Sequence, residues 1–73
     1  MYLTNILNEI KPGTLISIID RTAIVDTEIH KIDDILRDPY FQNHLFNRVH
    51  RVSSIYPQFD TSRAIAYLVI EID

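Results

Sequence analysis

Three side chains that can bind a metal ion alternate along one stretch of the sequence, in the pattern Asp26-x-Glu28-x-His30. On a β-strand, alternate side chains project from the same face and lie roughly 6.6 Å apart, so two neighbours can share one ion. Imidazole and carboxylate ligands suit zinc, or manganese when more oxygen ligands join. The stretch therefore allows a metal site, although alternating charges also occur simply as the wetted face of an edge strand.

Further ligands for such an ion are available in Asp33, Asp34, His44 and His50. The three histidines do not form the H-x-x-x-H or H-x-x-E-H spacings that bring two imidazoles to one metal. Ordinary surface or half-buried histidine is therefore the competing interpretation. We expect no obligatory cofactor, with zinc as the candidate metal.

Catalytic groups are poorly supported by the sequence. Ser53 and Ser54 lack the G-x-S-x-G turn of a serine nucleophile, and a chain with a single glycine has no glycine-rich phosphate loop. On a helix, the adjacent carboxylates Asp33 and Asp34 would diverge instead of facing one substrate. The absence of cysteine excludes thiolate chemistry and disulfides. We therefore expect a protein that is not an enzyme.

Side chains typical of protein interfaces gather in the middle of the sequence. Tyr40, His44 and Arg48 recur at four-residue spacing, which places them along one line of a helix. Tyrosine and arginine are favoured as interface anchors. Arg51 adds a second positive charge close to Arg48, and the carboxylates of Asp33 and Asp34 precede both in the sequence. The predicted partner-binding residues are Asp33, Asp34, Tyr40, His44, Arg48 and Arg51.

Charge and hydropathy limit the partners of the chain. A net charge of −3 disfavours general affinity for nucleic acid, which rests on neutralising phosphates. No apolar stretch approaches the roughly 18 residues that span a bilayer. The first residues also lack a basic segment followed by an apolar run, so we expect no signal peptide. A cytoplasmic location without a membrane partner follows as an expectation.

The stretch Ala64–Ile72 is the element that the others must cover. It is apolar at both alternating positions until Glu71 and rich in β-branched residues, which is typical of a strand in the middle of a sheet. A helix of this length is the competing interpretation, and β-branching argues against it.

The elements ahead of this strand follow from local patterns. A stripe at i, i+3, i+4 and i+7 predicts a short helix from Leu3 to Ile10, ended by Pro12–Gly13. Asp38 before Pro39 predicts the start of a second helix, with aspartate as N-cap, that reaches about Asn47. Asp33 and Asp34 can begin a helical turn just before it. The predicted strands are Thr14–Ile19, Ala23–Lys31 and Val49–Tyr56, the last closed by Pro57 ahead of a polar loop over Gln58–Arg63.

The order helix, strand, strand, helix, strand, strand is most simply packed as two hairpins in one sheet. We therefore predict an α+β fold with a four-stranded, mainly antiparallel sheet and two helices that cover one of its faces. A length of 73 residues gives room for one domain, so the prediction is a single domain over residues 1–73.

The stretches Val52-Ser53-Ser54-Ile55-Tyr56 and Leu68–Ile72, together with the opening helix, resemble small proteins of phages and mobile elements of Gram-positive bacteria. In those proteins a helix, a hairpin and a helical insert precede a V-x-S-I-Y strand that pairs with an L-V-I-E-I strand. The resemblance spans nearly all of the chain and implies the fold and a genomic context. Chains of this size and origin include anti-CRISPR inhibitors, which act mainly by binding host effector proteins.

Three hypotheses of function follow. The first is a non-enzymatic protein-binding module, encoded by a phage, that blocks a CRISPR effector nuclease in the host cytoplasm by steric binding. The second is a structural protein that self-assembles into a homo-oligomer, because so short a chain buries only about 60% of its unfolded surface. The third is a metal-dependent protein that uses Asp26, Glu28 and His30.

Overall fold

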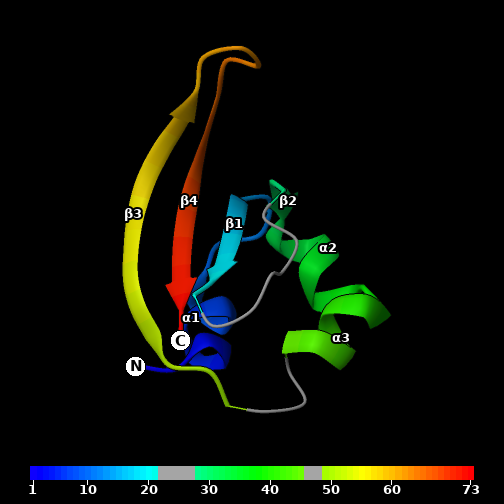
Figure 1. The fold of residues 1–73 in the computed structure, drawn as a ribbon. Coiled ribbons are helices and arrows are strands. Elements are labelled where there is room, and N and C mark those ends of the chain that lie inside the picture. The colour runs from blue at the N-terminus through cyan, green and yellow to red at the C-terminus, as the bar shows by residue number, and fades with distance from the viewer. Residues whose placement is uncertain (22–27, 46–48) are drawn as a thin grey trace.

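The computed structural model describes residues 1–21, 28–45 and 49–73, with the side chain of His44 excepted. Within these residues, helices lie against one face of a four-stranded sheet with the strand order β2-β1-β4-β3 (Figure 1). The elements are α1 (Leu3–Glu9), β1 (Leu15–Asp20), β2 (His30–Lys31), α2 (Ile32–Arg37), α3 (Pro39–Leu45), β3 (Val52–Asp60) and β4 (Ile65–Ile72). None of the described helices is long and apolar enough to cross a membrane.

β4 lies inside the sheet, as its composition predicts. It pairs with β1 in parallel on one side and with β3 in antiparallel orientation on the other. Ile70 and Ile72 are fully buried toward the helices, and Val69 is 4% exposed on the opposite face. The apolar residues at both alternating positions of β4 are therefore explained by neighbours on both edges.

The predicted α+β fold with a four-stranded sheet is confirmed, but the arrangement of its strands differs from the prediction, because the two central strands run in the same direction and make the sheet mixed. β1 pairs with β4 in parallel from Ile16 opposite Leu68 to Asp20 opposite Ile72. The antiparallel pairs β1–β2 and β3–β4 are both present, but β4 inserts beside β1. This order pairs the two most apolar runs at the centre and leaves the more polar β2 and β3 at the edges, where their outer sides meet water.

The prediction of two helices is also wrong, because the described residues contain three. The predicted turn at Asp33–Asp34 is a separate helix, α2. It ends at Arg37, and only Asp38 separates it from the start of α3 at Pro39. Pro39 cannot continue α2, since it lacks an N–H and disfavours a helical backbone in the residue before it. The predicted N-cap is confirmed: the N–H of Tyr40 donates to Asp38 Oδ1 at 2.9 Å.

Two predicted strand boundaries need correction. Of the predicted strand Ala23–Lys31, only His30–Lys31 is extended within the described residues, and 22–27 lie outside them. The strand predicted over Val49–Tyr56 is instead β3, which passes through Pro57 and ends at Asp60. An edge strand accommodates proline because the missing N–H can face away from the sheet.

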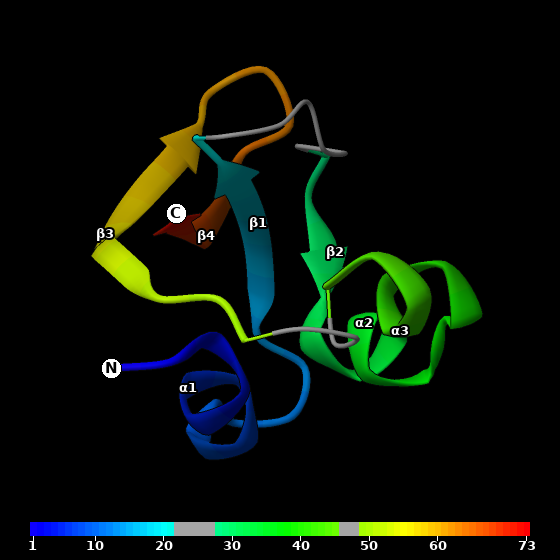
Figure 2. The ribbon, with the colours of Figure 1, turned by 60° about the horizontal axis from the view of Figure 1, so that its bottom comes forward.

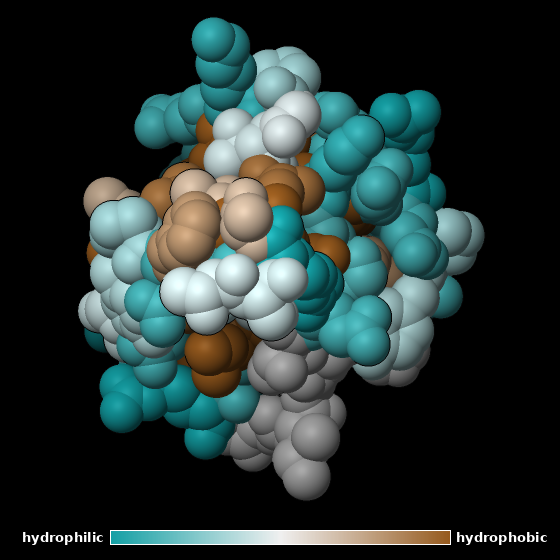
Figure 3. All heavy atoms as spheres, turned by 90° about the horizontal axis from the view of Figure 1, so that it is seen from above, coloured by the Kyte–Doolittle hydropathy of each residue, from teal (hydrophilic) through white to brown (hydrophobic). Residues whose placement is uncertain are grey.

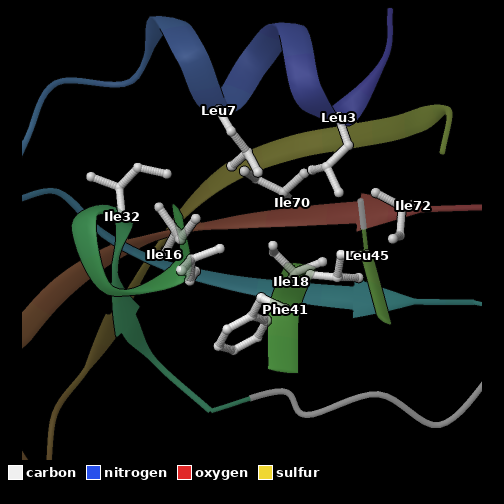
Figure 4. Packing of buried hydrophobic residues seen from close by; sticks show 10 residues of the cluster. Leu3, Leu7, Ile16, Ile18, Ile32, Phe41, Leu45, Ile70 and Ile72 are labelled. Carbon is white, nitrogen blue, oxygen red and sulfur yellow. The ribbon is translucent and has the colours of Figure 1, made fainter. Parts of the chain in front are cut away.

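The core lies between the sheet and the helices (Figure 4). Of the four residues in the predicted stripe of α1, Leu3 and Leu7 are 1% exposed, whereas Ile6 and Ile10 are only partly buried against the core. In α3, Leu45 is 1% and Phe41 3% exposed. Figure 2 shows α1 under the central strands, whereas α2 and α3 lie beside β2. The full cluster comprises Leu3, Leu7, Ile16, Ile18, Ile32, Ile35, Phe41, Leu45, Ile70 and Ile72.

The hairpin of β3 and β4 extends beyond the helices and ends in a tight turn (Figure 1). The side chain of Asp60 closes this turn, since its Oδ1 accepts hydrogen bonds from the hydroxyl of Ser62 at 2.7 Å and from the N–H of Ser62 at 3.0 Å. Arg63 adds an ion pair at 3.0 Å. The hydrogen bond from the Ser62 hydroxyl is the main cause that holds the pKa of Asp60 below its usual value. The predicted loop over Gln58–Arg63 is therefore confined to the turn at 61–64.

The last residue of this turn, Ala64, has a positive φ of 54°. A left-handed backbone costs a non-glycine residue about 1–2 kcal/mol, whereas glycine loses about 0.5–1 kcal/mol more entropy on folding. Ala64→Gly is therefore expected to raise the free energy of unfolding by about 0.5–1 kcal/mol in urea denaturation. Gly13→Ala is the matched control: Gly13 has φ 87° with open space around it, so this variant is expected to lose stability. A loss of stability in Ala64→Gly would contradict the turn geometry.

Candidate protein-binding surface

Hydrogen bonds at the end of β4 show which way its backbone groups point. The N–H of Asp73 donates to the carbonyl of Arg51, just before β3, and the N–H of Arg21, just after β1, donates to the carbonyl of Ile72, each at 3.0 Å. Backbone groups of successive residues point to opposite sides of a strand. Odd-numbered residues of β4 therefore face β3, and even-numbered residues face β1.

The same alternation leaves part of the outer side of β3 unpaired. The register sets even-numbered residues of β3 opposite odd-numbered residues of β4, as at Tyr56 and Val69. These even-numbered residues exchange hydrogen bonds with β4. The backbone groups of Ile55, Pro57 and Phe59 then point away from β4, to a side on which the sheet order places no further strand among the described residues. We call these outward-pointing groups the free edge.

The chain's own first residues cover the lower end of this side of β3. Tyr2 forms an antiparallel bridge with Arg51. In that bridge the N–H of Val52 donates to the carbonyl of Met1 at 3.0 Å. An extended segment therefore already lies against β3 on its outer side, at Arg51 and Val52.

Apolar side chains are exposed along the free edge. Ile55 is 41% exposed, Tyr56 38% and Phe59 57%. No charged residue occurs in the sequence from Val52 to Phe59, although edge strands are commonly protected by charges, proline or a bulge. Here the protection consists of Pro57 and an irregularity in register at the start of the strand. Figure 3 views the molecule from the end that carries the hairpin tip, and apolar and weakly polar residues gather there among hydrophilic ones.

Tyr56 is held on the sheet face opposite the helices by a carboxylate. The hydroxyl of Ser54 donates to Glu71 Oε2 at 2.8 Å, and Tyr56 is hydrogen-bonded to the same side chain. Partial burial of the ring raises the pKa of Tyr56 above its usual value, and the charge and hydrogen bond of Glu71 act in the same direction. The Glu71 carboxylate therefore lies beside the hydroxyls of both Ser54 and Tyr56.

Glu71→Gln is expected to lower the pKa of Tyr56 toward the ordinary value of 10.0, because it removes the negative charge beside the hydroxyl. A raised pKa stabilises the fold below pH 10, and this contribution disappears as the pH rises through the folded-state pKa. The variant should therefore lose less stability above pH 10 than the parent chain. Absorbance titration of tyrosinate measures the shift. Tyr56→Phe is the control, because it removes the titration of Tyr56 and leaves that of the other three tyrosines. An unchanged titration would argue against the Glu71 contact.

The structure describes five of the six residues that the sequence predicted to bind a partner, and it places them in two separate regions. Asp33 and Asp34 lie in α2, and Tyr40 and His44 lie in α3, beside β2 at one end of the sheet (Figure 2). Arg51 lies at the other end, where it pairs with the N-terminal segment beside β3. Arg48 lies outside the described residues, so its place in the predicted helix line stays a prediction.

Of this set, Asp34 lines an open, polar hollow of about 460 Å³. Its lining residues are His30, Asp34, Arg37 and Asp38. Tyr40 is 42% exposed, and its ring meets the ring of Phe41 edge-on, with 5.3 Å between the centroids. A second hollow, of about 130 Å³, lies between α1 and the other two helices. It is smaller than the ~300 Å³ typical of small-molecule sites.

The predicted metal site is described only in part. Asp26 lies outside the described residues, Glu28 is exposed, and His30 packs edge-on against Phe41 with 5.1 Å between the ring centroids. Among the described residues, no group of three metal-binding side chains comes together. His50 is 3% exposed, and neither of its ring nitrogens has a hydrogen-bond partner in the described part of the chain. The zinc site therefore stays a prediction.

Comparisons with known proteins leave the surface to be argued from its geometry. No protein-family model, no curated protein and no solved structure matches this chain. The free edge and its exposed side chains are the feature of the described residues that departs most from an ordinary surface. None of the six residues predicted to bind a partner lies on this surface, and the one sequence feature that could have indicated it is the uncharged run around Pro57.

Proposed function

We propose that this chain is a non-enzymatic module that binds another protein through the hairpin of β3 and β4. The free edge is the observation that carries the proposal, because its backbone groups have no partner strand among the described residues and the side chains of Ile55 and Phe59 are exposed. Exposed aromatic side chains are favoured anchors of protein interfaces, and an exposed sheet edge can bind an added strand.

The size of an ordinary interface indicates how much of the chain takes part. A standard complex buries roughly 800 Å² on each partner, which is about a sixth of the 4860 Å² that this chain exposes. The free edge alone is too small for that area. The interface therefore includes the neighbouring exposed aromatics Tyr56 and Tyr2, which are 38% and 43% exposed.

Site-specific photo-crosslinking tests this proposal. Benzoylphenylalanine is placed at Phe59 on the hairpin, at Tyr40 on the surface that the sequence predicts, and at Asn5 on the exposed side of α1 as the control. In extract of the source cells, the variant at Phe59 is expected to give one discrete protein adduct that the variant at Asn5 does not give. A discrete adduct from Tyr40 alone would move the interface to α3, and adducts from none of the three would contradict protein binding.

The resemblance to phage and mobile-element proteins gives the proposal a more specific form, in which the chain is an inhibitor that blocks a CRISPR effector nuclease by steric binding. This form rests on the sequence resemblance alone. Purified chain is expected to suppress cleavage of target DNA by a host effector, and Phe59→Lys is expected to abolish the suppression. Undiminished cleavage with excess wild-type chain would remove the inhibitor form without affecting protein binding as such.

Self-assembly is a second candidate function, and the free edge is also the observation that favours it. An unpaired edge strand is a template for pairing with another copy of the same chain. Pro57 opposes this use, because it removes the donor at the middle of the edge. Sedimentation at high micromolar concentration distinguishes the two: a monomer is expected from the binding module and an oligomer from the self-assembling protein.

A further inference from the structure

We propose that the free edge takes an extended segment of a different protein, which adds to the sheet as a further strand beside β3. This inference rests on the proposed function and specifies how the partner is held. Strand addition at an exposed sheet edge gives affinity through main-chain hydrogen bonds and specificity through alternate side chains.

The backbone groups set the length of the bound segment. The N–H and carbonyl groups of Ile55 and Phe59 and the carbonyl of Pro57 are available to an incoming strand, as the pairing of their neighbours with β4 implies. From the first to the last of these residues the strand rises roughly 14 Å. The chain's own residues 1–3 occupy the outer side of β3 ahead of Ile55. The added segment can therefore pair over about five residues, between that occupied part and the hairpin tip.

The exposed side chains set the chemistry of the bound segment. Ile55 lies opposite Ile70, whose side chain is in the core, so the odd-numbered side chains of β3 are on the helix-bearing face of the sheet. Directly opposed residues on neighbouring strands bring their side chains within about 5.5 Å. The partner segment therefore carries apolar residues at alternate positions, facing Ile55 and Phe59.

Pro57 selects a foreign strand over a second copy. It lies midway between Ile55 and Phe59, so a two-fold pairing that matches these two apolar residues would set Pro57 against its own counterpart. Neither proline has an N–H, so both central hydrogen bonds would be missing. A foreign strand with an ordinary residue opposite Pro57 loses one of them. The N-terminal segment beside Arg51 shows that this side of β3 does accept an added extended segment.

Selection from a displayed library of random nonapeptides tests the inference, with the wild-type chain as target and the double variant Ile55→Lys, Phe59→Lys as counter-target. Both side chains are exposed in the free chain, so the double variant is expected to keep its melting temperature. Selected peptides are expected to carry apolar residues at alternate positions. On binding they should slow the exchange of the Ile55 and Phe59 amide protons and leave that of Tyr40 unchanged.

Backbone-methylated forms of a selected peptide give the matched control. Methylation of the alternate amides that face the free edge is expected to weaken binding at least tenfold, whereas methylation of the other amides leaves it unchanged. The inference is overturned if no peptide prefers the wild type, or if bound peptides leave the Ile55 and Phe59 amides unprotected. In the latter case an adduct from Phe59 in the crosslinking experiment would still support protein binding by another geometry.

Discussion

Ile70→Ala is expected to lose about 2–5 kcal/mol of the free energy of unfolding, the range for removing a large aliphatic side chain from a packed core. Ile70 is fully buried and lies in the cluster that joins α1 to the centre of the sheet (Figure 4). A chain of 73 residues has roughly 4–11 kcal/mol of stability by size alone. The substitution therefore removes a large share of the stability, which urea denaturation followed by circular dichroism measures.

Ile55→Ala is the matched control, because the two isoleucines lie directly opposite each other on β3 and β4. Ile55 is 41% exposed, so this change is expected to cost less than about 1 kcal/mol. Equal losses in the two variants would mean that β4 is not the covered strand, and would contradict the arrangement of the sheet.

Pro57→Val is expected to convert the chain from a monomer into a self-associating species. The substitution introduces a backbone N–H at the middle of the free edge. It also adds a β-branched side chain, which favours strands. The sedimentation coefficient of the variant should rise with concentration in the micromolar range, whereas that of the wild type stays constant.

Gln58→Val separates the backbone effect from the added apolar surface. The backbone groups of Gln58 face β4, so this variant gains the same side chain on the same strand without a new outward donor. It is expected to stay monomeric. Association of Gln58→Val to the same extent as Pro57→Val would show that apolar surface, and not the missing donor, limits pairing at this edge.

The parts of the fold that local patterns specify were predicted from the sequence. The stripe of α1 and the N-cap at Asp38 depend on residues a few positions apart, and both are confirmed. The central place of β4 followed from its β-branched composition and its apolar residues at both alternating positions, which are typical of a strand in the middle of a sheet.

The pairing of the central strands was not predictable in the same way. β1 and β4 are about fifty residues apart in the sequence, and either direction of pairing buries the same apolar side chains. The sequence therefore indicated the two antiparallel pairs, whereas the parallel pairing between them could not be inferred. Pro57 was interpreted as the end of a strand, because proline removes a ladder hydrogen bond in a central strand. At the outer side of β3 no such bond is lost.

The candidate surface was missed for a related reason. The predicted binding residues were chosen for tyrosine and arginine at helical spacing. The free edge consists of backbone groups, and no particular residue type in the sequence indicates them. Its signal was an absence of charge around Ile55 and Phe59, which becomes informative only once β3 is known to be an edge strand.

Amide hydrogen exchange in the free wild-type chain tests the free edge most directly. The amide protons of Tyr56 and Gln58, which face β4, are expected to exchange slowly, whereas those of Ile55 and Phe59 exchange at rates near those of an unstructured peptide. Equal protection of all four amides in a monomer would show that the outer side of β3 is already paired, and would contradict the account.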